Sequence, residues 1–148
     1  MEGQGRIQCV LIATTGSNIV YERFYERFTD IEKADIRHSF QQTQSQLTQS
    51  TTECIGRCRA AATVAYAKGD LVYHAAGTGE YDELALAVIL RFLVSGLHDA
   101  LRKAPSEAVL LDNYARVCVI ISEIINEGVL EIADRATLLK ALKIKGIE

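Results

Sequence analysis

A glycine-rich turn, Gly77-Thr78-Gly79, is the first place in this sequence where chemistry could occur. It follows a segment that predicts a strand and precedes one that predicts a helix, which is the context in which backbone amides bind phosphate groups. The turn has no third glycine at the spacing of a dinucleotide-binding motif, and no Gly-Lys-Ser/Thr sequence follows it. The predicted elements around it do not form a parallel β-α-β unit. We therefore interpret residues 77–79 as an ordinary turn.

Three histidines, His38, His74 and His98, fall on three separate predicted elements, and none has a second ligand at metal-site spacing. Cys9 and His74 could form a nucleophile–base pair if their strands are neighbours. The sequence supplies neither the oxyanion hole nor the orienting group that such a pair requires. We expect no enzymatic activity, no cofactor and no metal.

Only two of the four cysteines, Cys54 and Cys58, are close in sequence. On a strand their Cα atoms would lie roughly 13 Å apart, at about 3.3 Å per residue, whereas a disulfide requires less than about 7 Å. On a helical turn or a loop the two could meet. We favour ordinary reduced cysteines over a redox or metal pair.

The composition favours one folded domain spanning residues 1–148. Hydrophobic residues make up 49% of the chain, which argues against disorder. The net charge is −3, and Lys140, Lys143 and Lys145 cluster only weakly. Phosphate binding needs clustered basic side chains, so we do not expect nucleic acid as a partner.

Neither a signal peptide nor a myristoylation site is found at the N-terminus. The most apolar run, Leu84 to Val94, is too short to cross a bilayer and contains Arg91. We therefore expect a cytosolic protein.

The first half of the chain predicts a β-hairpin, a helix and further strands. Apolar runs at 7–13 and 19–24 flank a Thr-Gly-Ser-Asn turn, which is a hairpin pattern. Asp30 is a candidate cap for a helix over 31–47, whose single apolar stripe allows one buried side. Residues 51–59 are ambiguous, and we interpret them as a loop with a short edge strand. Alanine-rich segments at 60–67 and 71–77 flank Lys68-Gly69-Asp70 and predict a second hairpin, with small side chains that suit central strands between helices.

The second half predicts two long apolar helices, at 82–102 and 107–126, separated by Pro105. Gly128 is expected to close the second of these helices. Asp134 is expected to cap a last helix over 135–143.

Both long helices have apolar arcs wider than one sheet contact requires. The arc of the first comprises Leu86, Ile89, Leu90, Phe92, Leu93, Val94, Leu97 and Leu101. That of the second comprises Leu110, Leu111, Tyr114, Val117, Cys118, Ile120, Ile121, Ile124 and Ile125. Two explanations remain open: the helices pack on each other, or part of the apolar surface contacts another protein.

The order strand, strand, helix, strands, helix, helix resembles the small-chain family of vesicle coats, which includes the sigma subunits of clathrin adaptors and the zeta subunit of coatomer. The resemblance covers about residues 7–142. It is carried by I-Q-C-V-L-I with the Gly16 turn and V-Y-E-R-F-Y, by the segment at 82–103, and by L-L-D-N-Y-A-R-V-C-V-I-I-S-E-I-I-N-E-G-V-L-E-I-A-D at 110–134. Within the family, the chain most resembles the sigma-like small subunits of plant TPLATE (TSET) endocytic complexes.

The resemblance implies a longin/SNARE-like α+β fold, an α-β-α sandwich in which a five-stranded antiparallel sheet has helices on both faces. It also implies a non-catalytic subunit that clamps a large coat subunit in clathrin-mediated endocytosis or vesicle traffic. Such a subunit would be cytoplasmic and recruited peripherally to the plasma membrane or to clathrin-coated vesicles through its complex, with no small-molecule substrate. The alternative is a longin-type regulatory module of a tethering or small-GTPase-regulating complex, since one fold serves both roles.

The resemblance further implies a pocket for acidic dileucine sorting signals, near Leu71, Val94, Ala104 and Val109. Lys103 stands where the family has a polar asparagine, and Pro105 changes the backbone where the signal would lie. For this reason we do not expect dileucine recognition to be retained.

Overall fold

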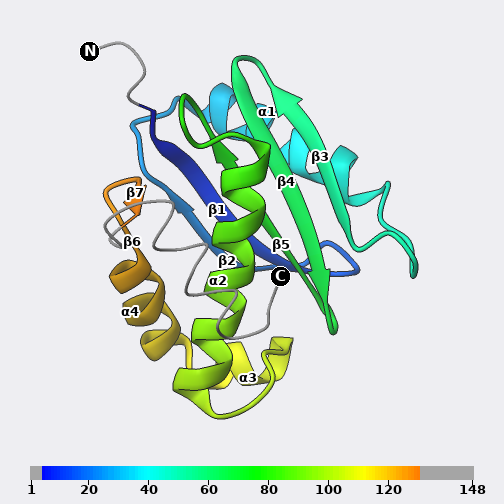
Figure 1. The fold of residues 1–148 in the computed structure, drawn as a ribbon, viewed down its shortest axis with the longest axis vertical. Coiled ribbons are helices and arrows are strands. Elements are labelled where there is room, and N and C mark those ends of the chain that lie inside the picture. The colour runs from blue at the N-terminus through cyan, green and yellow to red at the C-terminus, as the bar shows by residue number, and fades with distance from the viewer. Residues whose placement is uncertain (1–4, 131–148) are drawn as a thin grey trace.

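A five-stranded antiparallel sheet forms the centre of the computed structural model, which describes residues 5–130 (Figure 1). The elements are β1 (Ile7–Thr14), β2 (Ile19–Phe24), α1 (Asp30–Gln44), β3 (Glu53–Cys58), β4 (Ala61–Lys68), β5 (Leu71–Gly77), α2 (Glu83–Leu101), α3 (Glu107–Asp112), α4 (Tyr114–Ile124), β6 (Ile125–Asn126) and β7 (Val129–Leu130). The strands of the large sheet lie in the order β2-β1-β5-β4-β3.

Both predicted hairpins are confirmed. β1 pairs with β2 and β4 pairs with β5, each antiparallel. The first turn is held by the Thr14 hydroxyl, which accepts the Asn18 amide at 3.1 Å. In the second turn Gly69 has a φ of 64°, a left-handed conformation that glycine adopts without steric cost. Glycine therefore explains the second turn, whereas in the first turn the positive φ of 71° falls on Ser17.

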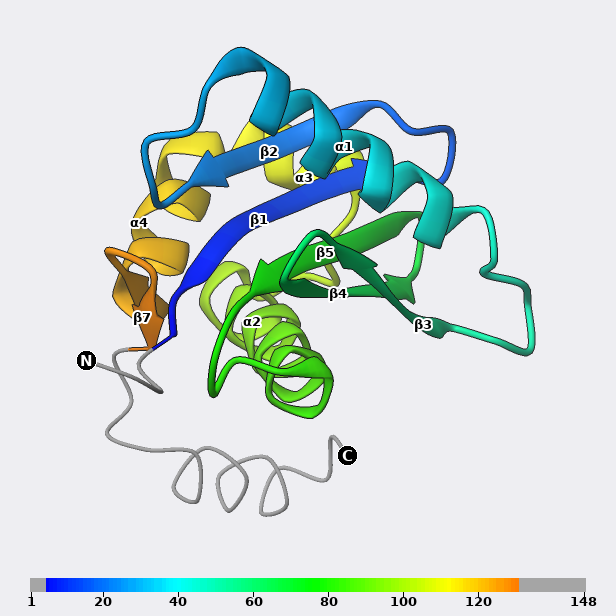
Figure 2. The same cartoon turned by 90° about the horizontal axis from the view of Figure 1, so that it is seen from above.

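Helices cover both faces of the sheet, as expected from the sequence (Figure 2). On one face α1 buries a small cluster with β1 and β5, made by Cys9, Leu11, Ala13, Ile36, Phe40 and Ala76. On the other face α2 and α4 share a larger apolar cluster with the sheet. The central strands carry small residues, such as the buried Ala65 and Ala75, which let helices approach closely on both faces.

The N-terminus of α1 differs by one residue from the prediction. Thr29, and not Asp30, is the N-cap: its side chain accepts the Glu32 amide at 3.1 Å, and the Glu32 carboxylate accepts the Thr29 amide at 2.8 Å. This reciprocal capping box satisfies two amides that the helix cannot pair internally. Asp30 is the first helical residue.

The edge strand predicted within residues 51–59 is confirmed, and it is longer than expected, since β3 extends from Glu53 to Cys58. β3 pairs with β4 along its whole length. α1 crosses it at Gly56, where an added Cβ would lie 2.6 Å from the Thr43 hydroxyl. The Ser39 hydroxyl donates to the Arg57 carbonyl at 3.1 Å nearby. Contacts with distant residues, which local sequence does not reveal, hold this strand.

α2 runs along the sheet as predicted, with Asp82 as its N-cap and Arg102, in a left-handed conformation, as its C-cap. Taken as a whole, the helix Glu83–Leu101 is long and apolar enough to cross a membrane, contrary to what the shorter run Leu84–Val94 suggested. More than half of its most apolar window is buried against the rest of the protein. Its composition is therefore explained by its place in the core.

The predicted single helix over 107–126 is wrong. It is two helices, α3 and α4, because the backbone at Asn113 leaves helical geometry with φ −121° and ψ 29°. The Asn113 side-chain amide donates to the Val109 carbonyl at 2.8 Å and so completes the end of α3.

Gly128 does not close a helix. It lies with Glu127 in the two-residue turn between β6 and β7, where φ is 52° at Glu127 and 78° at Gly128. Positive φ at both turn residues is the pattern of a type I′ hairpin. The Gly128 carbonyl accepts the Ile7 amide at 2.7 Å, which ties this hairpin to the start of β1. The predicted cap Asp134 and the predicted helix over 135–143 lie outside the described residues.

Candidate protein-interaction surface

α4 has apolar side chains on two opposite sides. Val117, Ile121 and Ile124 are buried against the core. Val119 is 58% exposed, and at 100° per residue it points away from those three. A helix that only covered its own core would need one apolar stripe with polar residues opposite. Val119 is therefore an apolar residue that this fold does not require on the outer side of α4, which also carries the exposed Arg116, Ser122 and Glu123.

Further exposed apolar residues lie on the elements that flank α4. Leu111 at the end of α3 is 53% exposed, Tyr114 at the start of α4 is 42% exposed, and Val129 in β7 is 46% exposed. α3, α4 and the β6–β7 hairpin follow one another on one side of the molecule (Figure 1). We call Leu111, Tyr114, Val119 and Val129 the α3–α4 surface. This surface extends around α4, because Tyr114 lies about 140° from Val119 on the helix.

The two predicted apolar arcs are covered to different extents. The arc of α2 is covered, with Phe92 half-buried and its other members buried by the sheet and α4. The arc of α3 and α4 is covered only in part, since Leu111 and Tyr114 remain exposed. Val119 and Val129 were not included in the predicted arcs. The spacing of Ala115 and Val119, four residues apart and both exposed, was the signal that could have identified apolar residues on the outer side of α4.

The other large exposed apolar residues are dispersed. Ile19, Ile31, Ile55 and Leu84 belong to β2, α1, β3 and α2, respectively. Isolated exposed apolar residues are normal on a protein surface and need no explanation by themselves. The α3–α4 surface differs because α3, α4 and the β6–β7 hairpin are neighbours, whereas β2 and β3 are opposite edges of the sheet.

The residues predicted to form a sorting-signal pocket are distributed between core and surface. Leu71 is fully buried at the start of β5, and Val94 is 6% exposed in the middle of α2. Val109 of α3 is half-buried and packs against the same core cluster. Ala104 is exposed in the loop between α2 and α3.

That loop is fixed against the β4–β5 turn. The Glu107 amide donates to the Asp70 carboxylate at 3.4 Å. Pro105 is buried, and its carbonyl oxygen lies 3.7 Å from the position that a Cβ on Gly69 would occupy. Ser106 caps α3, with its hydroxyl accepting the Val109 amide at 3.2 Å. In this conformation Leu71 and Val94 are closed to an incoming side chain.

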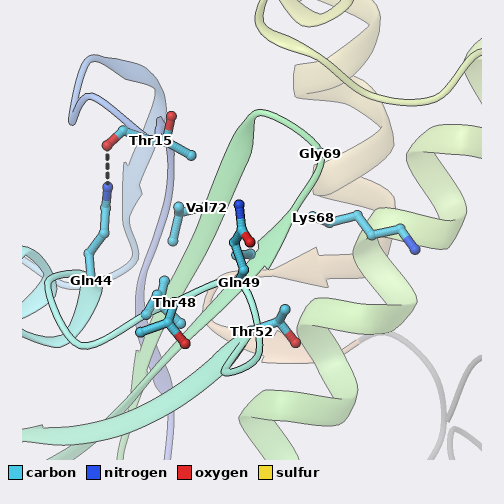
Figure 3. A pocket seen from close by; sticks show the side chains of 10 residues that line it. Thr15, Gln44, Thr48, Gln49, Thr52, Lys68, Gly69 and Val72 are labelled. Atoms are coloured by element: carbon cyan, nitrogen blue, oxygen red, sulfur yellow. Dashed lines mark hydrogen bonds between the residues drawn. The ribbon is translucent and has the colours of Figure 1, made fainter.

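A separate hollow of about 370 Å³ lies on the α1 side of the sheet, between the end of α1 and the β4–β5 turn (Figure 3). It is lined by Thr15, Gln44, Leu47, Thr48, Gln49, Thr52, Ala67, Lys68, Gly69 and Val72. Lys68 is the only charged residue of this lining, and its side chain points away from the other labelled residues (Figure 3). The lining offers amides and hydroxyls but no general base or thiol.

The residues that could have done chemistry have structural roles. Thr78 donates its amide to the Arg6 carbonyl at 3.0 Å, and Gly79 adopts a φ of 61°, so 77–79 is a turn held against β1. The N-terminus of α2 is occupied by the Asp82 carboxylate, which accepts the Ala85 amide at 3.0 Å. The Asp82 carboxylate therefore already fills the position at this helix N-terminus that a bound anion would take.

Cys9 and His74 lie on neighbouring strands, as the pair hypothesis required, but the register places His74 opposite Leu11. Burial raises the pKa of the Cys9 thiol well above its usual value, so the thiolate that would act as nucleophile is disfavoured. His74 directs Nε2 to the Gln44 side-chain oxygen at 2.8 Å.

Cys54 and Cys58 are free and lie in β3, four residues apart on a strand. Strand geometry keeps them beyond disulfide distance. Within residues 5–130, no group of three or more His, Cys, Asp or Glu side chains could hold a metal ion.

Comparison with known proteins identifies a family. The model of the clathrin adaptor complex small chain family matches residues 6–147. No curated protein matches. Among known structures, a chain of the AP-3 complex, from a homology model of the full-length complex in a stretched open conformation, superposes with a TM-score of 0.64 at 11% identity. The alignment covers 95% of this chain and 93% of the other, which confirms the longin-like fold. The family match spans nearly the whole sequence, and the chain therefore belongs to the clathrin adaptor complex small chain family.

Proposed function

We propose that this chain is a non-catalytic small subunit of a heteromeric adaptor complex and that it clamps a large coat subunit. The observation that carries this proposal is the exposed Val119, which is 58% exposed opposite the buried face of α4, together with exposed apolar residues on the neighbouring α3 and β7. Exposed apolar side chains on neighbouring elements are typical of a surface that another protein covers.

The chemistry of the contact would be burial of aliphatic and aromatic side chains inside a polar rim. Leu111, Val119 and Val129 offer aliphatic surface, and Tyr114 offers a ring with a hydroxyl that can remain at the edge. Charged residues such as Arg116 and Glu123 are exposed on α4 and suit the rim. A helical solenoid is the kind of partner that such a surface fits, because it presents complementary apolar ridges.

Within the family, we assign the chain to a sigma-like role in a complex of the TPLATE (TSET) type. In that role it acts in clathrin-mediated endocytosis, and it is a cytoplasmic protein recruited peripherally to the plasma membrane or to clathrin-coated vesicles by its complex. The support is the sequence resemblance over about residues 7–142. Contact with clathrin and membrane is indirect, through the other subunits.

Sorting-signal binding at Leu71, Val94, Ala104 and Val109 is a separate proposal. A dileucine side chain can reach Leu71 and Val94 only if the loop between α2 and α3 moves away from Gly69 and Asp70. We therefore expect the isolated chain not to bind an acidic dileucine peptide. Fluorescence anisotropy with a labelled peptide tests this, and saturable binding that Val94→Asp abolishes would show an open pocket.

Affinity purification of the tagged full-length chain from cells, with quantitative mass spectrometry, tests the proposed function. We expect large coat subunits to be recovered in a fixed molar ratio to the chain. Recovery of a small GTPase without any large coat subunit would instead favour the regulatory alternative. Recovery of the chain alone would contradict both.

A further inference from the structure

The outer edge of β3 has unpaired backbone groups. β3 is the last strand of the sheet, and among residues 5–130 only β4 pairs with it. The Ala67 amide donates to the Thr52 carbonyl at 2.7 Å, which shows that even-numbered residues direct their backbone groups toward β4. Glu53, Ile55 and Arg57 therefore direct their N–H and C=O groups outward, where another strand could pair with them. The Arg57 carbonyl already accepts the Ser39 hydroxyl at 3.1 Å, so a second strand would use its other lone pair.

The side chains of the same three residues lie on the α2 side of the sheet. Glu53 accepts a hydrogen bond from Arg91 at 2.6 Å, and Arg57 forms an ion pair with Glu83 at 3.7 Å. Ile55 lies between these charges and is 58% exposed. The edge thus has the order acidic, apolar, basic at spacings of two.

That order is complementary to itself. When two copies of β3 pair antiparallel about Ile55, each Ile55 lies opposite Ile55 of the partner subunit. Glu53 then lies opposite Arg57 of the partner subunit. Arg91 and Glu83 extend this contact to a row of four charges that alternate in sign across the junction. The residues paired in this register are also those whose backbone groups point outward.

Other pairings lose this match. A parallel pairing in register brings equal charges together, which is unfavourable. A shift by two residues places Ile55 opposite a charge, and a shift by one residue moves the side chains to opposite faces. On the α1 side, Cys54 would lie opposite Gly56 of the partner subunit, so the two opposed strand residues are small.

We propose that this chain associates with a second copy of itself by antiparallel pairing of β3, joining two five-stranded sheets into one. The inference rests on β3 alone and not on the proposed contact with a large subunit. It is therefore testable on the purified full-length chain.

Disulfide trapping tests the predicted register. Directly opposed residues in a hydrogen-bonded antiparallel pair have Cα atoms about 5.5 Å apart, which is suitable for a disulfide. Under mild oxidation the full-length Ile55→Cys variant should form a disulfide dimer through residue 55. The matched control is Ile31→Cys, which replaces another exposed isoleucine, on α1. Equal dimer yields from the two variants, or none from Ile55→Cys, would overturn the proposal.

A charge exchange tests the complementarity by sedimentation velocity over a concentration series. Glu53→Arg places two arginines opposite each other at both ends of the junction and should weaken the dimer about tenfold. Adding Arg57→Glu restores opposite charges between subunits, although both ion pairs with α2 stay broken. Recovery of the dimer in the double variant is the expected result. A wild-type chain that stays monomeric at every concentration would refute the pairing. A dimer whose affinity is the same in the wild type and both variants would also refute it.

Discussion

Lowering the pH from 7 to 5 should destabilise this protein through one buried histidine, His74. Its ring stacks on Phe40 with centroids 4.9 Å apart and is 1% exposed. The Gln44 amide nitrogen donates to the Thr14 carbonyl at 3.2 Å, which leaves the Gln44 oxygen to accept from His74 Nε2. Nδ1 is buried without a partner among the described residues. The structure thus holds the neutral, Nε2-protonated ring.

Burial lowers the pKa of His74 from 6.5 to about 4, because the charged ring would lose its hydration. The unfolded chain therefore takes up a proton below pH 6.5 while the folded chain does not. The corresponding stability is present at neutral pH and is lost as the pH falls from 6.5 toward 4. At pH 5, about 1.5 pH units below 6.5, the loss is about 2 kcal/mol, since each unit corresponds to 1.36 kcal/mol.

Urea unfolding at pH 7 and pH 5 measures this loss. His74→Gln keeps a side-chain donor near Gln44 but cannot titrate, so its stability should change between the two pH values by about 2 kcal/mol less than that of the wild type. Other titrating groups contribute equally to both proteins and cancel. The matched control is His38→Gln, which replaces an exposed histidine and should retain the wild-type difference. Equal pH dependence of His74→Gln and the wild type would refute the reasoning.

Two further substitutions test how α1 is held. Thr29→Ala removes the capping box and should lower the free energy of unfolding by about 1 kcal/mol, measured by urea denaturation, whereas Asp30→Asn should cost less than half of that. Gly56→Ala would place a methyl group 2.6 Å from the Thr43 hydroxyl and 2.9 Å from the Thr63 hydroxyl, and should cost about 1–3 kcal/mol. In the Thr43→Ala background the cost of Gly56→Ala should fall, and an unchanged cost would show that the close approach is not the cause.

The parts of the fold that sequence predicts well are those fixed by local chemistry. Gly69 marks the β4–β5 turn because that turn needs a positive φ. The Thr-Gly-Ser-Asn segment marks the β1–β2 turn by its turn-forming composition, and the positive φ there falls on Ser17. The limits of α2 follow from its apolar periodicity and from Asp82 as a cap. Each of these signals lies within a few residues of the feature that it predicts.

The features that sequence prediction missed depend on distant contacts. The edge strand β3 was predicted, but not its full length, because Gly56 disfavours strands while the contacts with β4 and α1 that hold it come from distant residues. No proline or glycine lies near Asn113, so the sequence gives no local signal for the break between α3 and α4. Gly128 was interpreted as a helix stop, although the apolar residues on both sides of the Glu127-Gly128 turn are also a hairpin pattern.

The candidate surface was predictable in part. Periodicity identified an apolar arc on the chain that forms α3 and α4, but it could not say which residues the core would cover. Tyr114 is 42% exposed although its ring lies beside that of Tyr21, with the centroids 6.3 Å apart. Val119 is exposed because α4 contacts the core through its opposite side.

The central claim, that a large coat subunit covers the α3–α4 surface, is tested most directly by comparing two matched variants in the native complex. Val119→Asp and Ile31→Asp each place a carboxylate at an exposed apolar position, so both should fold like the wild type. Quantitative mass spectrometry of tagged full-length chains purified from cells should recover large coat subunit with Val119→Asp at a level roughly tenfold or more below wild type, because burying an unpaired charge opposes binding. Ile31→Asp should recover it at the wild-type level. Equal recovery by Val119→Asp and the wild type would contradict the account.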